Sequence, residues 1–485
     1  MNTGNQKLSV FEKIGYSLGD LAANLIFQTL VTYLAYYYTD IYGLDPEDAS
    51  AIIFVVGLVA AFAFNPIIGA LADRTNSRWG KFRPWILWTA VPLGVIAVLA
   101  FTTPDLSYKG KLIYAVITYS LLLLMYAANN LPYGALSGVI TGDMKERNSM
   151  SSYRFVAVMF AQFFVQVFML SIIESAGNGN KAVGIGKLMI WLALIGTAML
   201  VTTFLTTKER IIPKPEQKSS LKQDLSDLVK NRPWLIMLLL TTMVFITLAM
   251  KGGAYVYYFE NYVDKESLTK FITPITDGLS KAGLNFFGKN PVSAGFGLFN
   301  AGGIIFMIIG IMFSKKLADK YGKRNVFGSM LAVSTFFILL FYFFPAKSVS
   351  LMFASQILHG FFYGLTIPLL WAMIADVADY NEWKNNHRAT AIIFSAMMVG
   401  LKGGLTIGSG LLTWILGMYN YVRPTPGNQH PVQSDSTVQG IKMLVSIFPS
   451  IPFLIGAALL FFYAINKKME TTIETDLKAR RSATS

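Results

Sequence analysis

Twelve stretches of mostly apolar residues run along the chain, and they constrain its fold more than any other feature. A bilayer core of about 30 Å needs roughly 20 apolar residues in a helix. Transmembrane β-strands would alternate apolar and polar residues, which stretches such as Leu121–Leu124 do not. The sequence therefore predicts an all-α membrane protein. The twelve predicted transmembrane helices cover approximately 14–38, 48–72, 84–102, 111–138, 154–175, 187–207, 233–261, 293–314, 326–345, 349–374, 391–419 and 440–465.

The composition of the chain supports a membrane protein and excludes several other classes. Only 14% of the 485 residues are charged and 54% are hydrophobic, whereas soluble domains carry about 25% charged residues. The 14% aromatic content excludes intrinsic disorder. With no cysteine and three histidines, a disulfide framework and a cysteine-based metal site are excluded, and a zinc centre is not expected. The sequence contains no phosphate-binding loop and no arrangement for a Ser-His-Asp triad, so we expect neither an enzyme nor a cofactor.

The positive residues are distributed unequally between the two sides of the predicted helices. The side that carries both termini has 28 of the 41 Lys and Arg residues, and the opposite side has ten. By the positive-inside rule both termini are predicted to be cytoplasmic, in the inner membrane. The net charge of +14 is thereby explained by topology, and a nucleic-acid partner is not indicated. The polar N-terminus shows no removable signal peptide.

The chain is predicted to consist of two similar halves. A polar segment, 208–232, separates six predicted helices in 1–207 from six in 233–466, and a charged tail, 467–485, follows. The tetrapeptides Leu-Ala-Asp-Arg and Leu-Ala-Asp-Lys occur in equivalent loops of the two halves. Because an Asp at a helix end can pair with basic residues of a neighbouring helix end, these residues are candidates for a cytoplasmic gate. The gate candidates are Asp73, Arg74, Asp319 and Lys320.

Several longer motifs carry a family resemblance. They are GYSLGD at 15–20, NPIIG at 65–69, SRWGKFRPW at 77–85, MIADVADY at 373–380 and KGG at 402–404. With these motifs the chain resembles the major facilitator superfamily, and more narrowly the glycoside–pentoside–hexuronide cation symporters, the family of melibiose permease. The resemblance runs over nearly all twelve helices. It implies two six-helix bundles that work by alternating access, and secondary transport of a sugar or glycoside by a protein that functions as a monomer.

Polar residues inside the hydrocarbon region are costly and are therefore candidates for function. Asp20 and Asn24 lie four residues apart and face one side of the first predicted helix. Amide and charged groups can hydrogen-bond the hydroxyls of a sugar, and an aromatic ring can cover its C–H surface. The resemblance places sugar-binding positions on Asn24 and Asn130, with basic partners at Arg154 and Lys402. The predicted substrate-binding residues are Asn24, Asn130, Tyr133, Arg154, Trp371 and Lys402.

The chain departs from the family pattern at the coupling-cation site. The two carboxylates that the family places in the second helix fall on Ala61 and Asn65, and an assisting hydroxyl of the fourth helix falls on Ala127. An amide lacks the full negative charge that offsets dehydration of a cation, so the family's sodium site is predicted to be absent or much weakened. Asn65 and Asp20 are then the coupling candidates, and whether the coupling ion is H+ or Na+ stays open.

Three alternatives for transport follow from this departure. The chain could couple to protons through Asp20, move its substrate passively, or use Lys251 and Lys402 to attract an acidic sugar. A lysolipid transporter is an alternative substrate class, against which the polar Asn residues argue, and a sensor would need a soluble signalling domain. The segment 262–292 could form an interfacial helix or a covering loop.

Overall fold

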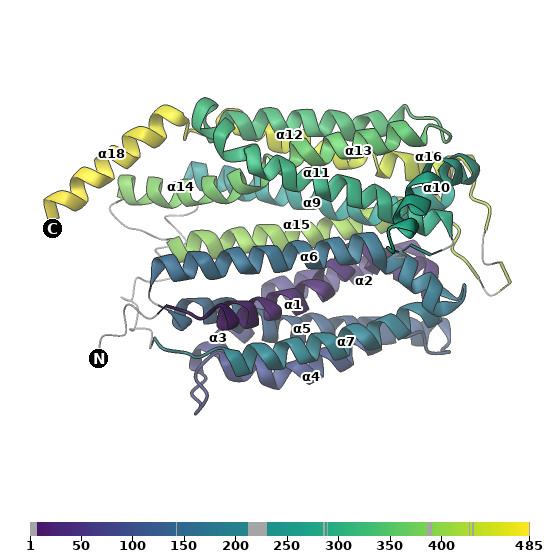
Figure 1. The fold of residues 1–485 in the computed structure, drawn as a ribbon, viewed down its shortest axis with the longest axis horizontal. Coiled ribbons are helices and arrows are strands. Elements are labelled where there is room, and N and C mark those ends of the chain that lie inside the picture. Colours follow the sequence, from purple (N-terminus) through teal and green to yellow (C-terminus); the bar gives the residue numbers. More distant parts are fainter. Residues whose placement is uncertain are drawn as a thin grey trace. The chain divides into compact units, whose positions relative to one another are not determined.

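The computed structural model describes residues 7–141, 143–211, 230–284, 287–288, 290–385, 390–425, 427–428 and 431–484. Within these residues it contains twelve helices, or pairs of consecutive helices, that are long and apolar enough to cross a membrane (Figure 1). No β-strand forms in the described part, which holds only an isolated bridge between Thr425 and Asn428. The predicted all-α class and the number of spans are confirmed.

The first half of the chain supplies seven α-helices. They are α1 (Val10–Tyr36), α2 (Pro46–Val59), α3 (Asn65–Arg74), α4 (Arg83–Ala100), α5 (Tyr108–Ile140), α6 (Met144–Gly177) and α7 (Lys181–Thr206). Two π-helical turns, η1 (Tyr37–Ile41) and η2 (Ala60–Phe64), follow α1 and α2. Because η2 joins α2 directly to α3, these three elements make one membrane span.

The second half supplies ten described α-helices. They are α9 (Arg232–Asn261), α10 (Lys265–Lys281), α11 (Pro291–Tyr321), α12 (Lys323–Leu339), α13 (Val349–Gly364), α14 (Ile367–Asn385), α15 (Thr390–Met418), α16 (Asp435–Leu444), α17 (Ile447–Leu459) and α18 (Lys467–Thr484). Short 3-10 turns, η3 (Leu340–Tyr342) and η4 (Leu460–Phe462), extend α12 and α17. Part of the segment 262–292 is thus a helix, α10, which buries Leu268 and Ile272.

Some helices extend well beyond the apolar stretches that predicted them. α6 begins at Met144, where the prediction began at 154. Its polar first turns are stabilised because the side chain of Asp143 accepts a hydrogen bond from the Lys145 N–H, and Glu146 pairs with Lys13 at 2.8 Å. Hydrophobicity marks only the part of a helix that faces lipid or core, so it cannot locate such polar ends.

The chain divides into two compact units. Unit 1 contains residues 1–216, 275–297 and 420–432, and unit 2 contains 217–274, 298–419 and 433–485. In unit 1, α1 packs against α6 and α7, and α4 packs against α5 and α7. In unit 2, α9 packs against α15 and α17, and α12 packs against α13 and α17. Most of the expected linker, 208–232, lies outside the described residues.

Glycines allow α15 to approach α9 closely. A Cβ atom added to Gly404 would lie 2.6 Å from the carbonyl oxygen of Thr242, and one added to Gly408 would lie 2.4 Å from that of Ile246. Both distances are shorter than a carbon–oxygen contact allows, so only glycine fits. Small residues at such crossings are typical of membrane helices. The close contact fixes α15, and with it Lys402, relative to α9.

The segment after α15 is held on unit 1 by an ion pair. Nε of Arg423 donates to Asp45 Oδ1 at 2.7 Å, and its guanidinium also donates to the Gly43 carbonyl oxygen at 2.6 Å. The Tyr108 hydroxyl donates to Asp45 at 2.9 Å, and the Tyr421 hydroxyl donates to Asp40 at 2.6 Å. Partial burial alone would raise the pKa of Asp45, but the hydrogen bonds from Arg423 and Tyr108 hold it below its usual value.

We expect the Arg423–Asp45 pair to stabilise unit 1 in a pH-dependent way. Since the pKa of Asp45 is lowered on folding, the contribution is present above its unfolded pKa of about 3.9 and is lost as the pH falls through the folded value. Asp45 is half exposed, so Arg423→Gln should cost at most about 1 kcal/mol at pH 7. Thermal unfolding in detergent at pH 7 and pH 3 measures the difference, which should be smaller at pH 3 because part of the Asp45 carboxylate is then protonated.

The matched control for this prediction is Lys109→Gln, because Lys109 is exposed and forms no ion pair among the described residues. Equal unfolding temperatures of the Arg423→Gln and Lys109→Gln variants at pH 7 would contradict a stabilising role of the pair.

Candidate functional site

An ion pair lies within the membrane-spanning helices of unit 1. Nε of Arg154, on α6, donates to Asp20 Oδ2, on α1, at 2.9 Å. The Asp20 side chain is 8% exposed and that of Arg154 is 31% exposed. Asp20 is the carboxylate of α1–α7 that lies farthest from any helix end, since the others all lie within a turn or so of one. The opposite charge of Arg154 compensates the cost of its burial.

Asn24 contributes to this pair from the next turn of α1. Its Nδ2 donates to Asp20 Oδ1 at 3.1 Å and to the Asp20 carbonyl oxygen at 2.9 Å. The predicted common face of Asp20 and Asn24 is therefore confirmed. Asn24 and Arg154 together fix the orientation of the Asp20 carboxylate, one at each oxygen.

Two stacked tyrosines lie beneath the guanidinium of Arg154. The rings of Tyr16 and Tyr133 are 4.6 Å apart and nearly parallel, at 12°. Each hydroxyl donates to the backbone carbonyl oxygen of the other residue, at 3.1 and 2.7 Å. Cζ of Arg154 lies 5.7 Å from the Tyr16 ring centroid and 5.5 Å from that of Tyr133, within reach of a cation–π interaction.

We name these five residues the Asp20–Arg154 cluster: Tyr16, Asp20, Asn24, Tyr133 and Arg154. Tyr133 is fully buried and stacks on Tyr16. It therefore packs against the Arg154 guanidinium. Tyr16 was not predicted as a site residue. Gly19, three residues after Tyr16, makes room for the ring that stacks on Tyr16, because a Cβ atom at Gly19 would lie 2.5 Å from the Tyr133 ring. The GYSLGD motif thus contains both the ring and the space for its partner.

The remaining predicted amides of unit 1 lie at two places. Asn130 is half-buried on α5, and its side chain forms no hydrogen bond among the described residues. Its neighbour Asn129 donates to Thr89 Oγ1 at 2.8 Å. Asn65 is half-buried at the first residue of α3, directly after the π-helical turn η2. π-Helical turns inside membrane helices are frequent at functional sites.

The positions of the expected cation ligands are apolar apart from Asn65. Ala61 is 7% exposed, and Ala127 is buried in a small cluster with Ile68 and Ala128. No group of three or more acidic or histidine side chains gathers in the described residues as a metal site would require. Of the three expected cation-ligand positions, only Asn65 carries a side-chain oxygen, the ligand type that a hard cation prefers.

In unit 2 the predicted binding residues lie on two helices. Lys402 is half-buried on α15, on the opposite side of that helix from the glycines that contact α9. Trp371 is on α14 and is 38% exposed. A further lysine, Lys251, is buried on α9.

The predicted gate residues lie at helix ends. Arg74 is the exposed last residue of α3, and the side chain of Asp73 is outside what the structure describes. Asp319 and Lys320 are exposed near the end of α11, and their carbonyl oxygens accept hydrogen bonds from Lys467 Nζ at 2.8 and 3.2 Å. The gate pairing itself stays a prediction.

Other residues, which were not predicted, hold the loop before α4. Glu209 accepts hydrogen bonds from the backbone N–H groups of Lys81, Phe82 and Arg83 at 2.7–2.8 Å. Gly80 has a φ of +110°, and a Cβ atom there would lie 2.4 Å from Cδ of Glu209. The carboxylate thereby satisfies the free N–H groups at the start of α4.

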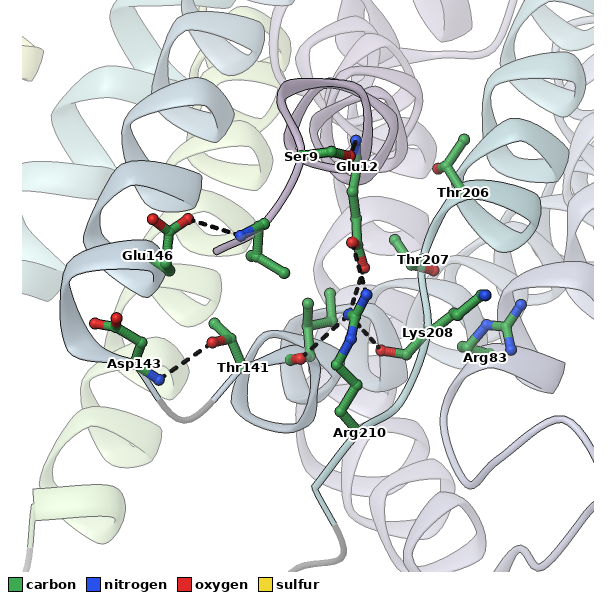
Figure 2. Close-up of polar contacts among 12 residues, drawn as sticks. Ser9, Glu12, Arg83, Thr141, Asp143, Glu146, Thr206, Thr207, Lys208 and Arg210 are labelled. Carbon is green, nitrogen blue, oxygen red and sulfur yellow. Dashed lines mark hydrogen bonds and ion pairs between the residues drawn. The ribbon is translucent and has the colours of Figure 1, made fainter. Parts of the chain in front are cut away.

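A second carboxylate fixes the residues that follow α7. Nη1 and Nη2 of Arg210 donate to the Glu12 carboxylate at 2.7 and 2.9 Å (Figure 2). Nη1 also donates to the carbonyl oxygen of Ile140 at 3.4 Å. The starts of α1 and α4 and the ends of α5 and α7 are therefore tied together. Sequence spacing gave no signal for these contacts, because they join residues up to 198 positions apart.

Comparisons with known proteins agree with this architecture. The family model described as MFS/sugar transport protein matches residues 15–279 and 276–467. The chain is 34% identical to the inner membrane symporter YicJ of Escherichia coli over 98% of this chain and 97% of that one. It is 33% identical to the putative glycoside/cation symporter YagG of E. coli over 96% and 94%. A bacterial homologue of the human lysosomal transporter Spinster shares the fold, with a TM-score of 0.63, 14% identity, and coverage of 96% and 98%.

A double-mutant cycle measures whether Asp20 and Arg154 depend on each other. Asp20→Asn and Arg154→Gln should each lower the free energy of unfolding by up to roughly 3 kcal/mol, because each leaves an uncompensated charge. The double variant should recover most of the loss, and chemical unfolding of the four proteins in detergent gives the coupling energy. Losses that simply add would show that the two charges do not stabilise each other.

Proposed function

Because this chain belongs to the MFS/sugar transport protein family, we propose that the Asp20–Arg154 cluster forms part of the binding site through which it moves a sugar or glycoside across the inner membrane. The chain is a multi-pass secondary transporter and not an enzyme. Its substrate is a small molecule. Transport proceeds by alternating access, in which one half of such a protein moves against the other.

The Asp20–Arg154 cluster is the observation that supports this proposal. A charge inside the membrane is retained where it serves a function, and Arg154 is only partly covered by Asp20 and the two rings. Its guanidinium has five N–H groups, of which one donates to Asp20, and planar donors of this kind suit sugar hydroxyls. Asn24, whose Nδ2 is used by Asp20, adds an amide acceptor on α1, and the half-buried Asn130 adds an amide on α5.

The rest of the site and the domain organisation follow the family pattern. We assign Lys402 and Trp371 to the substrate site of the second half, and Asp73, Arg74, Asp319 and Lys320 to a gate on the cytoplasmic face. The functional halves are 1–207 and 233–466, joined by the cytoplasmic linker 208–232 and followed by the tail 467–485. Both termini are cytoplasmic, and one copy of the chain forms the complete transporter.

Energy coupling is proposed to work without the sodium site of the family. Ala61, Asn65 and Ala127 provide one amide oxygen where the family places carboxylates and a hydroxyl. Asp20, the remaining membrane carboxylate of unit 1, is the candidate for proton coupling. Passive movement is the alternative if no gradient drives uptake.

Counterflow of radiolabelled glycosides in proteoliposomes tests the function. We expect exchange of at least one sugar or glycoside, and a loss of at least tenfold in Arg154→Gln. An inward sodium gradient should give no uphill uptake by the wild type, whereas the Ala61→Asp, Asn65→Asp double variant should gain sodium dependence, because two carboxylates restore hard anionic ligands.

The matched control for the gain of sodium dependence is Ala61→Asn, which adds similar volume without charge. Uphill uptake driven by sodium in the wild type would contradict the absence of the site. Exchange of lysolipids, with no glycoside exchanged, would contradict the proposed substrate class.

A further inference from the structure

Carboxylates are absent from most of the membrane-spanning helices of unit 2. The sequences of α12, α13, α15 and α17 contain no Asp or Glu. In α9 and α11 the acidic residues are Glu260 and Asp319, close to the helix ends. In α14, Asp376 is paired with Lys323, and Asp379 and Glu382 follow in the second half of the helix. The buried middle of unit 2 therefore offers little negative charge to a cation.

Lys251 is a buried cation in the middle of this region. It lies on α9 and is 8% exposed. No described carboxylate lies within ion-pair distance of its Nζ, which instead lies 5.4 Å from the centroid of the Tyr255 ring. Glu260 is nine positions further along α9, which corresponds to about 13 Å along the helix axis.

The Tyr255 ring beside Lys251 is linked through its hydroxyl to the amide of Gln356. The Tyr255 hydroxyl donates to Gln356 Oε1 at 3.1 Å, which leaves the amide NH2 of Gln356 as a donor. That amide lies against α11, because a Cβ atom at Gly303 would be 2.7 Å from Gln356 Nε2. His359, one turn further along α13, lies within electrostatic range of Lys251 and is held by Ser334 at 2.8 Å.

The buried cations of the two units differ in their partners. Arg154 has an internal counterion in Asp20, while a ring face is the only attractive partner of the Lys251 ammonium in the described residues. A cation–π contact stabilises a buried ammonium less than its lost hydration did. An anion bound beside the ammonium would supply the missing stabilisation.

We propose that Lys251 is an anion-binding residue and that the substrate carries a carboxylate, as an acidic glycoside does. The proposal rests on the proposed function, since it assigns the charge of the transported glycoside. The Lys251 ammonium pairs with the carboxylate, and the Gln356 amide donates a second hydrogen bond to it. A neutral glycoside offers neither partner a charge. A bound neutral glycoside would leave the Lys251 ammonium without a counterion, so the acidic glycoside should bind more tightly.

The same chemistry could come from a free inorganic anion, so the test compares both sources. Affinities of the purified protein are measured by calorimetry for methyl β-D-glucuronide and methyl β-D-glucoside, and for the matching galacturonide and galactoside. Inorganic phosphate and chloride are titrated separately. The variants are Lys251→Gln, Lys251→Arg, and Lys109→Gln as the surface control.

The wild type should bind the acidic member of at least one pair tenfold or more tightly than the neutral one. Lys251→Gln should remove this preference while changing the affinity for the neutral glycoside less than threefold. Lys251→Arg, which keeps the charge and provides the folding control, should retain at least a third of the preference, and Lys109→Gln all of it.

Two results would overturn the inference and leave the proposed function intact. The first is that the wild type binds neutral glycosides as tightly as acidic ones. This result does not depend on whether a variant folds. The second is a phosphate or chloride site that Lys251→Gln abolishes, without any preference for acidic glycosides. A protein that binds and exchanges no glycoside of either charge would instead overturn the proposed function, and this inference with it.

Discussion

The Asp20–Arg154 ion pair is the interaction on which the proposed site depends. Each charge would be costly alone in the membrane, and each is stabilised by the other at 2.9 Å. The stacked rings of Tyr16 and Tyr133 support the guanidinium, and Asn24 holds the second carboxylate oxygen. The pair thus joins α1 to α6 and presents a partly exposed set of donors within the membrane. Its cost of burial is compensated before any substrate binds.

The two halves of the chain handle buried charge differently. Unit 1 pairs Asp20 with Arg154, and the positions that the family resemblance assigns to the cation are Ala61 and Asn65. Unit 2 buries Lys251 among donors and rings, with no described carboxylate near enough to form an ion pair. In the described membrane helices, Asp20 is paired with Arg154, whereas Lys251 has a ring face and no carboxylate beside it. On this basis we propose that the membrane region does not bind sodium and accepts a ligand that carries its own negative charge.

Helix content and the local part of the site could be predicted from the sequence, because both depend on short spacing. Apolar stretches located twelve spans, and the interval of four between Asp20 and Asn24 placed both on one helix face. Arg154 lies 134 residues from Asp20, and no spacing rule connects them. Glu209 was also missed, because its three backbone partners are recognised only once α4 has formed. Contacts of this kind are set by helix packing, for which one sequence gives no direct signal.

The measurement that tests the central claim most directly uses the absence of cysteine from the natural sequence. Asn24→Cys introduces a single thiol in the Asp20–Arg154 cluster, and Ser152→Cys introduces one at an exposed position of α6. Alkylation by N-ethylmaleimide is timed with and without a saturating transported glycoside. If the cluster is the binding site, the glycoside slows alkylation of the Asn24→Cys variant at least fivefold and leaves the Ser152→Cys variant unchanged. Equal rates with and without glycoside at position 24 would contradict the account.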